Sequence, residues 1–412
     1  MFVTVNAIGE SFPCQPKTAS SSRTTKTLKI LFIVRQLNIG GAERQLVTLA
    51  NELAARGHDV VIASFYRGGA LSEKLDFGRV RLVSLEKRSR WDLLSLCVNT
   101  LRVVSQERPA VVHGWMYTPN LMATVARIFN PEVKLFWCMR SSNLDTVTDW
   151  MEKMAAWLES ELSRFADCIV VNSLAGLEHA VSEGYPRNKM LFIPNGIDTN
   201  VFYPDDAARE RVRAEWGVGH SEKLIGNVAR FNPIKNHPLF LKAAARIAAE
   251  RPDVRFFCIG HGKASYLAEL QDLTRSLGID ARVRWIQARP DMRAVYNALD
   301  VFCSSSLSEG FPNVIGEAMA CGRRCVVTDV GDSKLVTGDT GVVVPSNDLE
   351  ALATGLRQEL DRSGLNFRAR QRILENFSVP QLGDQTERAL LSHVYQVADT
   401  NHTRMHTHGL QP

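Results

Sequence analysis

Several motifs that would commit a chain to other chemistries are missing from these 412 residues. There is no Gly-x-Gly-x-x-Gly, so a nicotinamide or flavin site lacks its usual phosphate-binding turn. There is no Gly-x4-Gly-Lys-Ser/Thr, which argues against a P-loop nucleotidase. No Asp-x-Asp occurs either, so a metal held on a diphosphate through that motif is not indicated. We therefore expect neither a metal site nor a bound cofactor.

Long apolar runs and paired cysteines are also missing. No run approaches the roughly 18 residues that span a bilayer, and residues 1–27 lack the basic start and apolar core of a signal peptide. The eight cysteines form no Cys-x-x-Cys pair and mostly stand in apolar runs, which is typical of buried free thiols in a reducing compartment. We therefore expect a cytoplasmic protein, with peripheral contact at the inner face of the membrane as an alternative.

What is present is the composition of a globular protein. The chain is 45% hydrophobic and 23% charged, and its length suggests two domains of roughly 180 residues each. The net charge of +5 is mild for this length and makes no case for a nucleic-acid partner. It is compatible with an anionic substrate or an anionic membrane surface. Lys87-Arg-Ser-Arg-Trp91 begins an amphipathic helix, which either touches such a surface or is a solvated face.

Apolar, β-branched runs alternate with stretches of helical periodicity along most of the chain. Leu28–Leu37 is typical of a buried parallel strand, and Leu46, Leu49 and Leu53 follow it at helical spacing. The alternation continues to about residue 200 and restarts at residue 223. It predicts an α/β fold of two Rossmann-like, doubly wound parallel-sheet domains that face each other across a cleft.

The predicted domain boundaries follow shifts in composition. Asp, Asn, Pro and charged residues gather between the two alternating halves, which indicates a linker there. The loops that follow strands should carry the site, because ligands of such sheets bind at the carboxyl ends of the strands. The predicted parts are an N-terminal extension without fixed structure (1–27), a first domain (28–200), a linker (201–222), a second domain (223–378), a final amphipathic helix (379–398) and a flexible tail (399–412).

The segment from Glu309 to Glu317 carries the clearest chemistry. An apolar run precedes it and a helical stretch follows, which predicts a strand, a tight loop and a helix N-terminus. The loop of Gly310, Phe311, Pro312 and Asn313 would bring backbone N–H groups to an anionic ligand. The two carboxylates suit the hydroxyl groups of ribose and a hexose. Anion and sugar together indicate a nucleotide sugar, and a surface acid beside a helix-terminal acid is the plainer alternative.

Arg230 and Lys235 follow the first strand of the second domain. Both are expected on a loop that leads into a helix, near the carboxyl edge of the sheet. Two cations fixed there would bind a diphosphate and neutralise charge that develops on a leaving group. The alternative is that both are ordinary solvated charges of a loop.

Weaker candidates follow strands of the first domain. Gly40 and Gly41 would let the backbone approach a phosphate or sugar, unless they only make a tight turn. His113 ends a strand and is a candidate catalytic or acceptor-side group, although a lone histidine is more often structural. Arg140 and Asn143 are polar enough to line an acceptor pocket.

Taken together, these segments resemble family 4 of the retaining glycosyltransferases (glycosyl transferases group 1), which has the GT-B fold. The resemblance implies transfer of a hexose-type sugar from a nucleoside diphosphate sugar, UDP- or GDP-linked, to a hydroxyl acceptor with retained configuration. It also implies that the final helix crosses back to the first domain. The motifs that carry it are Gly40-Gly-Ala-Glu-Arg44, Asn172-Ser173, Ile193-Pro-Asn-Gly-Ile-Asp198, Val228-Ala-Arg230, Lys235-Asn-His237, Ser306 to Gly322, and Thr328-Asp-Val-Gly331.

The resemblance implies roles for four residues. Arg230 and Lys235 would grip the diphosphate, Glu317 would hold ribose, and Glu309 would contact the donor sugar. The implied acceptor is a glycan or a lipid-linked molecule in exopolysaccharide or lipopolysaccharide assembly. A nucleotide-sugar epimerase of similar fold and an inactive glycosyltransferase-like binding subunit stay as alternatives.

The chain departs from the family pattern at two places. Trp115 stands where many relatives carry a histidine, so His113 is left as the candidate on the acceptor side. Arg323 and Arg324 replace the small residue and proline that relatives favour after Gly322. Loss of a proline's fixed φ is expected to change the rigidity of that loop more than the chemistry.

Overall fold

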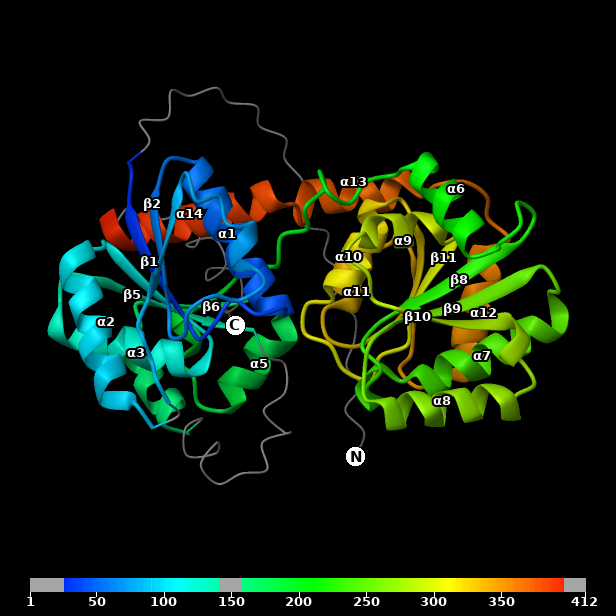
Figure 1. Ribbon diagram of the computed structural model, residues 1–412, viewed down its shortest axis with the longest axis horizontal. Coiled ribbons are helices and arrows are strands. Elements are labelled where there is room, and N and C mark those ends of the chain that lie inside the picture. The colour runs from blue at the N-terminus through cyan, green and yellow to red at the C-terminus, as the bar shows by residue number, and fades with distance from the viewer. Residues whose placement is uncertain (1–25, 90, 141–156, 396–412) are drawn as a thin grey trace, which may run out of the picture.

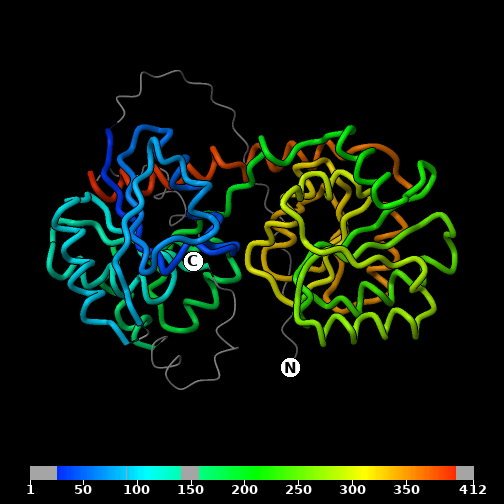
Figure 2. Tube along the Cα trace, viewed as in Figure 1, coloured from blue at the N-terminus to red at the C-terminus, as the bar shows by residue number. Residues whose placement is uncertain are grey.

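The apolar runs of the sequence form two parallel sheets in the computed structural model, which describes residues 26–89, 91–140 and 157–395. Figures 1 and 2 show the two domains side by side, with helices on both faces of each sheet. Most of the predicted N-terminal extension, the tail at 399–412 and Asn143 lie outside the described residues.

The first sheet has seven strands in the order β3-β2-β1-β4-β5-β6-β7, and every neighbouring pair is parallel. Most residues of its central strands are apolar, as expected where helices cover both faces. The strands are β1 (Lys29–Val34), β2 (Asp59–Ser64), β3 (Val80–Ser84), β4 (Val111–Trp115), β5 (Lys134–Met139), β6 (Cys168–Val171) and β7 (Met190–Phe192).

The second sheet repeats this arrangement with six parallel strands in the order β10-β9-β8-β11-β12-β13. The prediction of two Rossmann-like parallel-sheet domains is therefore confirmed. The strands are β8 (Lys223–Val228), β9 (Val254–Gly260), β10 (Val283–Gln287), β11 (Val301–Ser304), β12 (Arg324–Thr328) and β13 (Val342–Val344).

Helices sandwich each sheet, and successive residues of a strand face different helical layers. In β1, Phe32 belongs to one apolar cluster while Leu31 and Ile33 belong to another on the opposite face. Leu224 and Ile225 of β8 divide in the same way. The helices are α1 (Gly41–Ala55), α2 (Leu93–Glu107), α3 (Tyr117–Phe129), α5 (Leu174–Ser182), α6 (Asp206–Glu215), α7 (His237–Glu250), α8 (Ala264–Ser276), α9 (Met292–Ala298), α10 (Asn313–Ala320), α11 (Ser333–Thr337), α12 (Leu349–Leu360), α13 (Phe367–Asn376) and α14 (Val379–Tyr395).

Strand order reverses at equivalent points of the two sheets. In each, the first strand lies between the second and the fourth, so β1 pairs with β2 and β4, and β8 pairs with β9 and β11. The connections at such a reversal leave the sheet on opposite faces and open a crevice at the carboxyl edge. Each domain therefore offers its binding crevice at the end of its own first strand.

The predicted linker contains a helix that is part of the second domain. Val212 of α6 and the following Trp216 are buried in a cluster with residues of that domain. Arg209 and Arg213 place their guanidinium groups 2.7 and 3.1 Å from the carboxylate of Asp300, which precedes β11. The sequence of α6 predicted a linker because it is highly charged. In the fold, two of these charges hold α6 against the second domain through their ion pairs with Asp300.

The last helix, α14, lies against α1 of the first domain (Figure 1). Arg56, at the end of α1, pairs with Asp384 at 2.5 Å and with Glu387 at 3.0 Å. Leu382 and Leu390 of α14 are buried in the same cluster as Leu46 and Leu53 of α1. The chain therefore passes between the domains twice, once before α6 and once after α13.

Two bulk features can be read from the described residues. None of the helices in the described ranges combines the length and apolar character that crossing a membrane requires. The seven described cysteines are all free, and all but Cys97 are buried.

The anchoring of α6 can be tested with Asp300→Asn. The neutral side chain leaves Arg209 and Arg213 without their carboxylate, and removing one partner of a largely buried ion pair costs about 3 kcal/mol. We expect the free energy of unfolding from urea titration to fall by about that amount. Asp361→Asn is the control, because its side chain is 73% exposed and its pair with Arg251 is on the surface. Equal midpoints for the two variants would contradict the anchoring role.

Candidate functional site

A cavity of about 570 Å³ lies between the carboxyl edges of the two sheets. Both domains contribute to its wall, and the contributing segments are loops after strands and the first turns of helices. It is the place where the parallel topology of both domains predicts a ligand. Its lining includes most of the predicted site residues: Gly40, Gly41, Arg140, Arg230, Lys235, Glu309, Gly310, Phe311, Pro312, Asn313 and Glu317.

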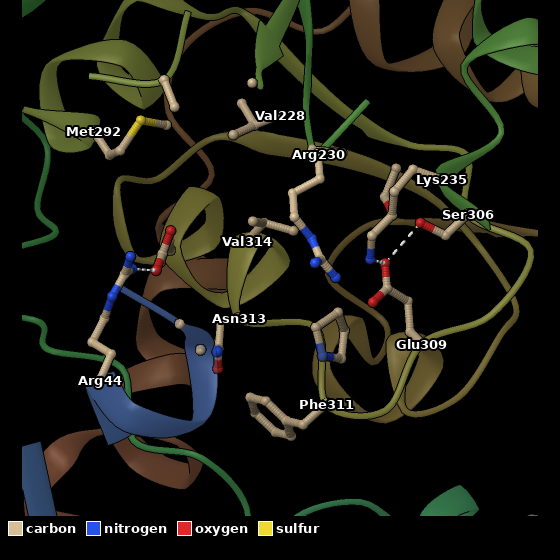
Figure 3. A pocket seen from close by; sticks show the side chains of 18 of the residues that line it. Arg44, Val228, Arg230, Lys235, Met292, Ser306, Glu309, Phe311, Asn313 and Val314 are labelled. Carbon is tan, nitrogen blue, oxygen red and sulfur yellow. Dashed lines mark hydrogen bonds and ion pairs between the residues drawn. The ribbon is translucent and has the colours of Figure 1, made fainter. Parts of the chain in front are cut away.

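Glu309 is held by two neighbours on one of its carboxylate oxygens. The Nζ of Lys235 lies 2.6 Å from Oε1, and the Ser306 hydroxyl donates to the same oxygen at 2.7 Å (Figure 3). The side chains of Lys235 and Glu309 are 17% and 10% exposed, so water screens this pair only partly. The second carboxylate oxygen, Oε2, makes no hydrogen bond or ion pair with the described residues and is left to accept a ligand hydroxyl.

Arg230 and Lys235 both come from the loop after β8, as predicted. The Asn232 side chain accepts from the backbone N–H of Ile234 and caps the short 3-10 turn that carries Lys235. Arg230 is exposed, and Figure 3 shows its guanidinium group reaching into the cavity between Val314 and the Lys235–Glu309 pair. Arg230 makes no ion pair with the residues that the structure describes, so its charge is available to an anion.

Gly331 sets the position of the Glu309 loop. Its φ of +53° is in the left-handed region, and a β-carbon there would lie 2.1 Å from the carbonyl oxygen of Glu309. The next residue, Asp332, donates its backbone N–H to the carbonyl of Gly310 at 3.0 Å. The glycine of the Thr328-Asp-Val-Gly331 motif therefore lets its own backbone segment lie directly against the backbone of Glu309 and Gly310.

Two helix N-termini converge on the cavity. Gly40 is the N-cap of α1 of the first domain, and Pro312 is the N-cap of α10 of the second. A β-carbon on Gly41 would lie 3.8 Å from the side-chain nitrogen, Nδ2, of Asn313, so the two helix starts are close. Unpaired N–H groups and the positive end of the helix dipole at both favour an anion between them.

Glu317 lies in α10 at the wall of the cavity and is 6% exposed. The Tyr296 hydroxyl donates to its Oε2 at 2.7 Å, and Arg44 of the first domain lies 3.3 Å from its Oε1. Burial raises the pKa of the Glu317 carboxyl, while Arg44 and Tyr296 oppose this rise. The sequence placed Arg44 in a motif but assigned it no role, because only the fold brings α1 of one domain against α10 of the other.

The position of His113 contradicts its predicted role on the acceptor side. The ring is 1% exposed and lies among Phe32, Trp115 and Phe136 at centroid distances of 5.2, 5.7 and 5.7 Å. It does not line the cavity. Burial lowers the pKa of His113 to about 3. The strand end does face the cleft, but His113 is two residues short of it and points into the core of the first domain.

Arg140 does line the cavity and is fixed by aromatic and amide groups. Its guanidinium carbon lies 4.2 Å from the centre of the Trp115 ring, and it donates to the Asn195 side chain. Asn195 in turn donates to the Asn313 side chain at 2.8 Å, across the domain boundary. Trp115, the departure from the family pattern, therefore serves as the platform for Arg140.

Asp332 makes a second polar contact between the domains. Its buried carboxylate accepts from the backbone N–H groups of Leu174 and Ala175, which begin α5 of the first domain. The charge lies at the positive end of that helix. Burial raises the pKa of Asp332, and these two hydrogen bonds oppose the rise. Sequence reasoning missed both residues as domain contacts, although Asn195 stands in the Ile193–Asp198 motif and Asp332 directly follows the Thr328–Gly331 motif.

Comparisons with known proteins agree with this architecture. The family model described as Glycosyltransferase Family 4 matches residues 39–201, and that described as Glycosyl transferases group 1 matches residues 222–362. HepE of Anabaena in complex with UDP superimposes with a TM-score of 0.77 at 21% identity, over 89% of this chain and 100% of that one. A glycosyltransferase of Rickettsia africae superimposes with a TM-score of 0.77 at 17% identity, over 90% of this chain and 100% of that one.

Two curated relatives are similar in sequence. The D-inositol 3-phosphate glycosyltransferase of Mycobacteroides abscessus is 34% identical over 217 residues, which are 51% of this chain and 48% of the relative. The putative glycosyltransferase EpsF of Bacillus subtilis is 24% identical over 323 residues, 75% of this chain and 81% of the relative. The chain thus spans about half the length of the first of these relatives.

The two family models together cover every strand of the two sheets except β1, and they include the loops that line the cavity; the solved structures share the fold. The chain belongs to the group 1, family 4 glycosyltransferases and has their GT-B fold.

Proposed function

We propose that this protein transfers a hexose-type sugar from a nucleoside diphosphate sugar to a hydroxyl acceptor, with retained configuration at the anomeric carbon. The proposal rests on one cavity at the carboxyl edges of two parallel sheets, where the cations Arg230 and Lys235 meet two carboxylates and two helix N-termini. Cations and N-termini suit a diphosphate, while carboxylates suit sugar hydroxyls.

The diphosphate would bind between Arg230, Lys235 and the start of α10. Arg230 brings an uncompensated charge, and Lys235 brings a charge already shared with Glu309. Backbone N–H groups near Asn313 would add hydrogen bonds and the field of the helix. Such preorganised donors stabilise charge that develops on a leaving phosphate without having to reorganise during the reaction.

The sugar and the ribose would bind to different carboxylates. Glu309 offers Oε2 to a hydroxyl of the donor sugar, because Lys235 and Ser306 both occupy Oε1. Glu317 would accept from the ribose hydroxyls in exchange for, or together with, its contact to Arg44. HepE of Anabaena has been solved with UDP and with UDP-glucose, which favours UDP over GDP as the first donor to test.

Retention would follow from a reaction on one face of the sugar. Glu309 is bound to a lysine and a hydroxyl, so it is suited to hold the sugar rather than to attack it. The leaving phosphate would then take the proton of the acceptor hydroxyl as the new bond forms, and the protein would supply orientation and charge stabilisation.

The acceptor would approach from the first domain, near Arg140 and the N-terminus of α1. We infer a glycan or lipid-linked acceptor in exopolysaccharide or lipopolysaccharide assembly, since one relative carries the name D-inositol 3-phosphate glycosyltransferase and a lipopolysaccharide outer core galactosyltransferase has the same fold. A hydroxyl of a polyol or sugar is common to these acceptors.

The start of α2 fits a peripheral contact with a membrane. Leu94 and Val98 of α2 are 80% and 47% exposed and lie one turn apart on one side of the helix, and Trp91, two residues before the helix, is 72% exposed. Arg88 is exposed beside them. Since α2 follows β3, this apolar face lies at the same edge of the sheet as the cavity. A lipid-linked acceptor could therefore reach the site while this face lies in the lipid headgroups.

The site assignment can be tested with Lys235→Ala and Glu309→Gln. The first removes a diphosphate contact and the second removes the charge that receives a donor hydroxyl. We expect each to lower kcat for sugar transfer from UDP-glucose by about 100-fold or more, with an unchanged melting temperature. Lys242→Ala, an exposed lysine on the neighbouring α7, is the matched control and should be fully active.

Near-normal transfer by both variants would contradict the assignment. The reaction is followed as release of UDP and formation of glycosylated product, with and without acceptor. Conversion of the nucleotide sugar without any acceptor would instead point to an epimerase.

The membrane contact can be tested with the double variant Trp91→Glu and Leu94→Glu. Two charges in place of two inserted apolar side chains should weaken binding to phosphatidylglycerol vesicles by about tenfold or more in a sedimentation assay. Phe129→Glu, at the far end of α3 and also exposed, is the control. Equal vesicle binding by the double variant and the control would rule out this face as the contact.

A further inference from the structure

Arg323 is a buried arginine without a carboxylate partner among the described residues. It is 4% exposed and follows α10 directly. Its Nε donates to the carbonyl of Cys321 at 2.9 Å, and its Nη1 donates to the carbonyls of Asn297 and Leu299 at 3.2 and 3.0 Å. The remaining nitrogen, Nη2, is buried and has no hydrogen-bond partner. A buried, unpaired donor on a charged group is costly and calls for a ligand.

Arg323 lines a cavity of about 250 Å³ on the side of the second domain away from the cleft. Lys223 and Arg324, the first residues of β8 and β12, lie on its wall, so the cavity is at the amino edge of the sheet. Arg209 and Arg362 complete five cationic side chains, against three carboxylates. A second buried nitrogen, the Nε of Arg324, also has no partner.

Two of the three carboxylates are already occupied by arginines. Asp300 receives Arg209 and Arg213 on separate oxygens. The side chain of Glu359 is 0% exposed and receives Arg324 at 3.4 Å and Arg362 at 2.8 Å. Each of these acids therefore faces two guanidinium groups and cannot neutralise a further one.

The third carboxylate, that of Asp206, is exposed and forms no ion pair with Arg323. Lys223 likewise has no carboxylate within 4.0 Å among the described residues. Burial lowers the pKa of Arg323 to about 10, which still leaves the guanidinium protonated at neutral pH. The cavity therefore keeps an excess of positive charge.

We propose that this cavity binds a small phosphate-bearing anion, with Arg323, Arg324 and Lys223 as its main ligands. The planar fork of a guanidinium matches the oxygens of a phosphate, and a compact lysine charge adds to it. The site is separate from the cleft, which lies at the opposite edge of the same sheet. It also gives Arg323 and Arg324 a binding role, whereas the loss of the family's proline after Gly322 was expected only to change the rigidity of the loop.

Occupancy of this site would act on helices that reach the cleft. Arg323 binds the carbonyl groups at the ends of α9 and α10, and Tyr296 and Glu317 of these two helices line the donor cavity. An anion that fixes Arg323 would hold both helix ends in place. We therefore expect phosphate to stabilise the second domain without competing for the donor site.

The test is a titration of the full chain with inorganic phosphate, in which the melting temperature is measured at each phosphate concentration. Chloride is used to keep the ionic strength constant. Phosphate should raise the melting temperature more than chloride does, because binding to the folded state stabilises it. Glycerol phosphate, titrated in parallel, distinguishes a free phosphate from a phosphate monoester as the preferred ligand. The Lys235→Ala variant should respond like the parent chain, which separates this site from any phosphate binding in the cleft and from the proposed transferase function.

The double variant Lys223→Met, Arg362→Gln alters the exposed side of the cavity and spares the buried carbonyl contacts. It should bind phosphate about tenfold more weakly. Arg323→Met should abolish the response, and Arg357→Gln, an arginine of α12 outside the cavity, should leave it unchanged. Equal stabilisation by phosphate and chloride, or an unchanged phosphate response in the double variant, would overturn the proposal.

Discussion

The parallel direction of every strand in both sheets is the constraint on which the rest of this molecule depends. Parallel strands deliver all the following loops to one edge, and the chain crosses between the domains so that these two edges face each other. Residues as distant in sequence as Gly41, Lys235 and Glu309 therefore line one cavity. The same rule places the segments before the strands, with Lys223 and Arg324, on the far side.

Charge is distributed so that each buried carboxylate of the cleft is held by partners from another element. Glu309 is held by Lys235 from the loop after β8, and Glu317 by Arg44 from the other domain. Removing a charge from water is costly unless it is paired, so these pairs both permit the burial and fix the carboxylate orientation. Arg230 in the cleft and Arg323 on the far side, by contrast, are cations without a carboxylate partner among the described residues.

The contacts between the domains are polar and few, and they coincide with the site. Asn195 with Asn313, Arg44 with Glu317, and Asp332 with the start of α5 all cross the boundary beside the cavity. Away from it, α14 packs on α1 through an apolar cluster and the ion pairs of Arg56. The boundary is therefore polar beside the cavity and apolar where α14 packs on α1.

Local patterns in the sequence were enough to predict the two sheets, most of their helices and most of the residues that line the cavity. Strand and helix periodicity is local, and the segment around Glu309 combines residue types whose chemistry is plain in isolation. Other features depend on contacts between segments that are distant in sequence. The charges of α6 are typical of a linker, but in the fold they pair with Asp300. His113 was predicted to face the cleft, but its ring lies among aromatic side chains. Arg44 and Arg323 gained their roles from neighbours distant in sequence, and no local pattern encodes which distant groups a folded chain brings within hydrogen-bonding distance.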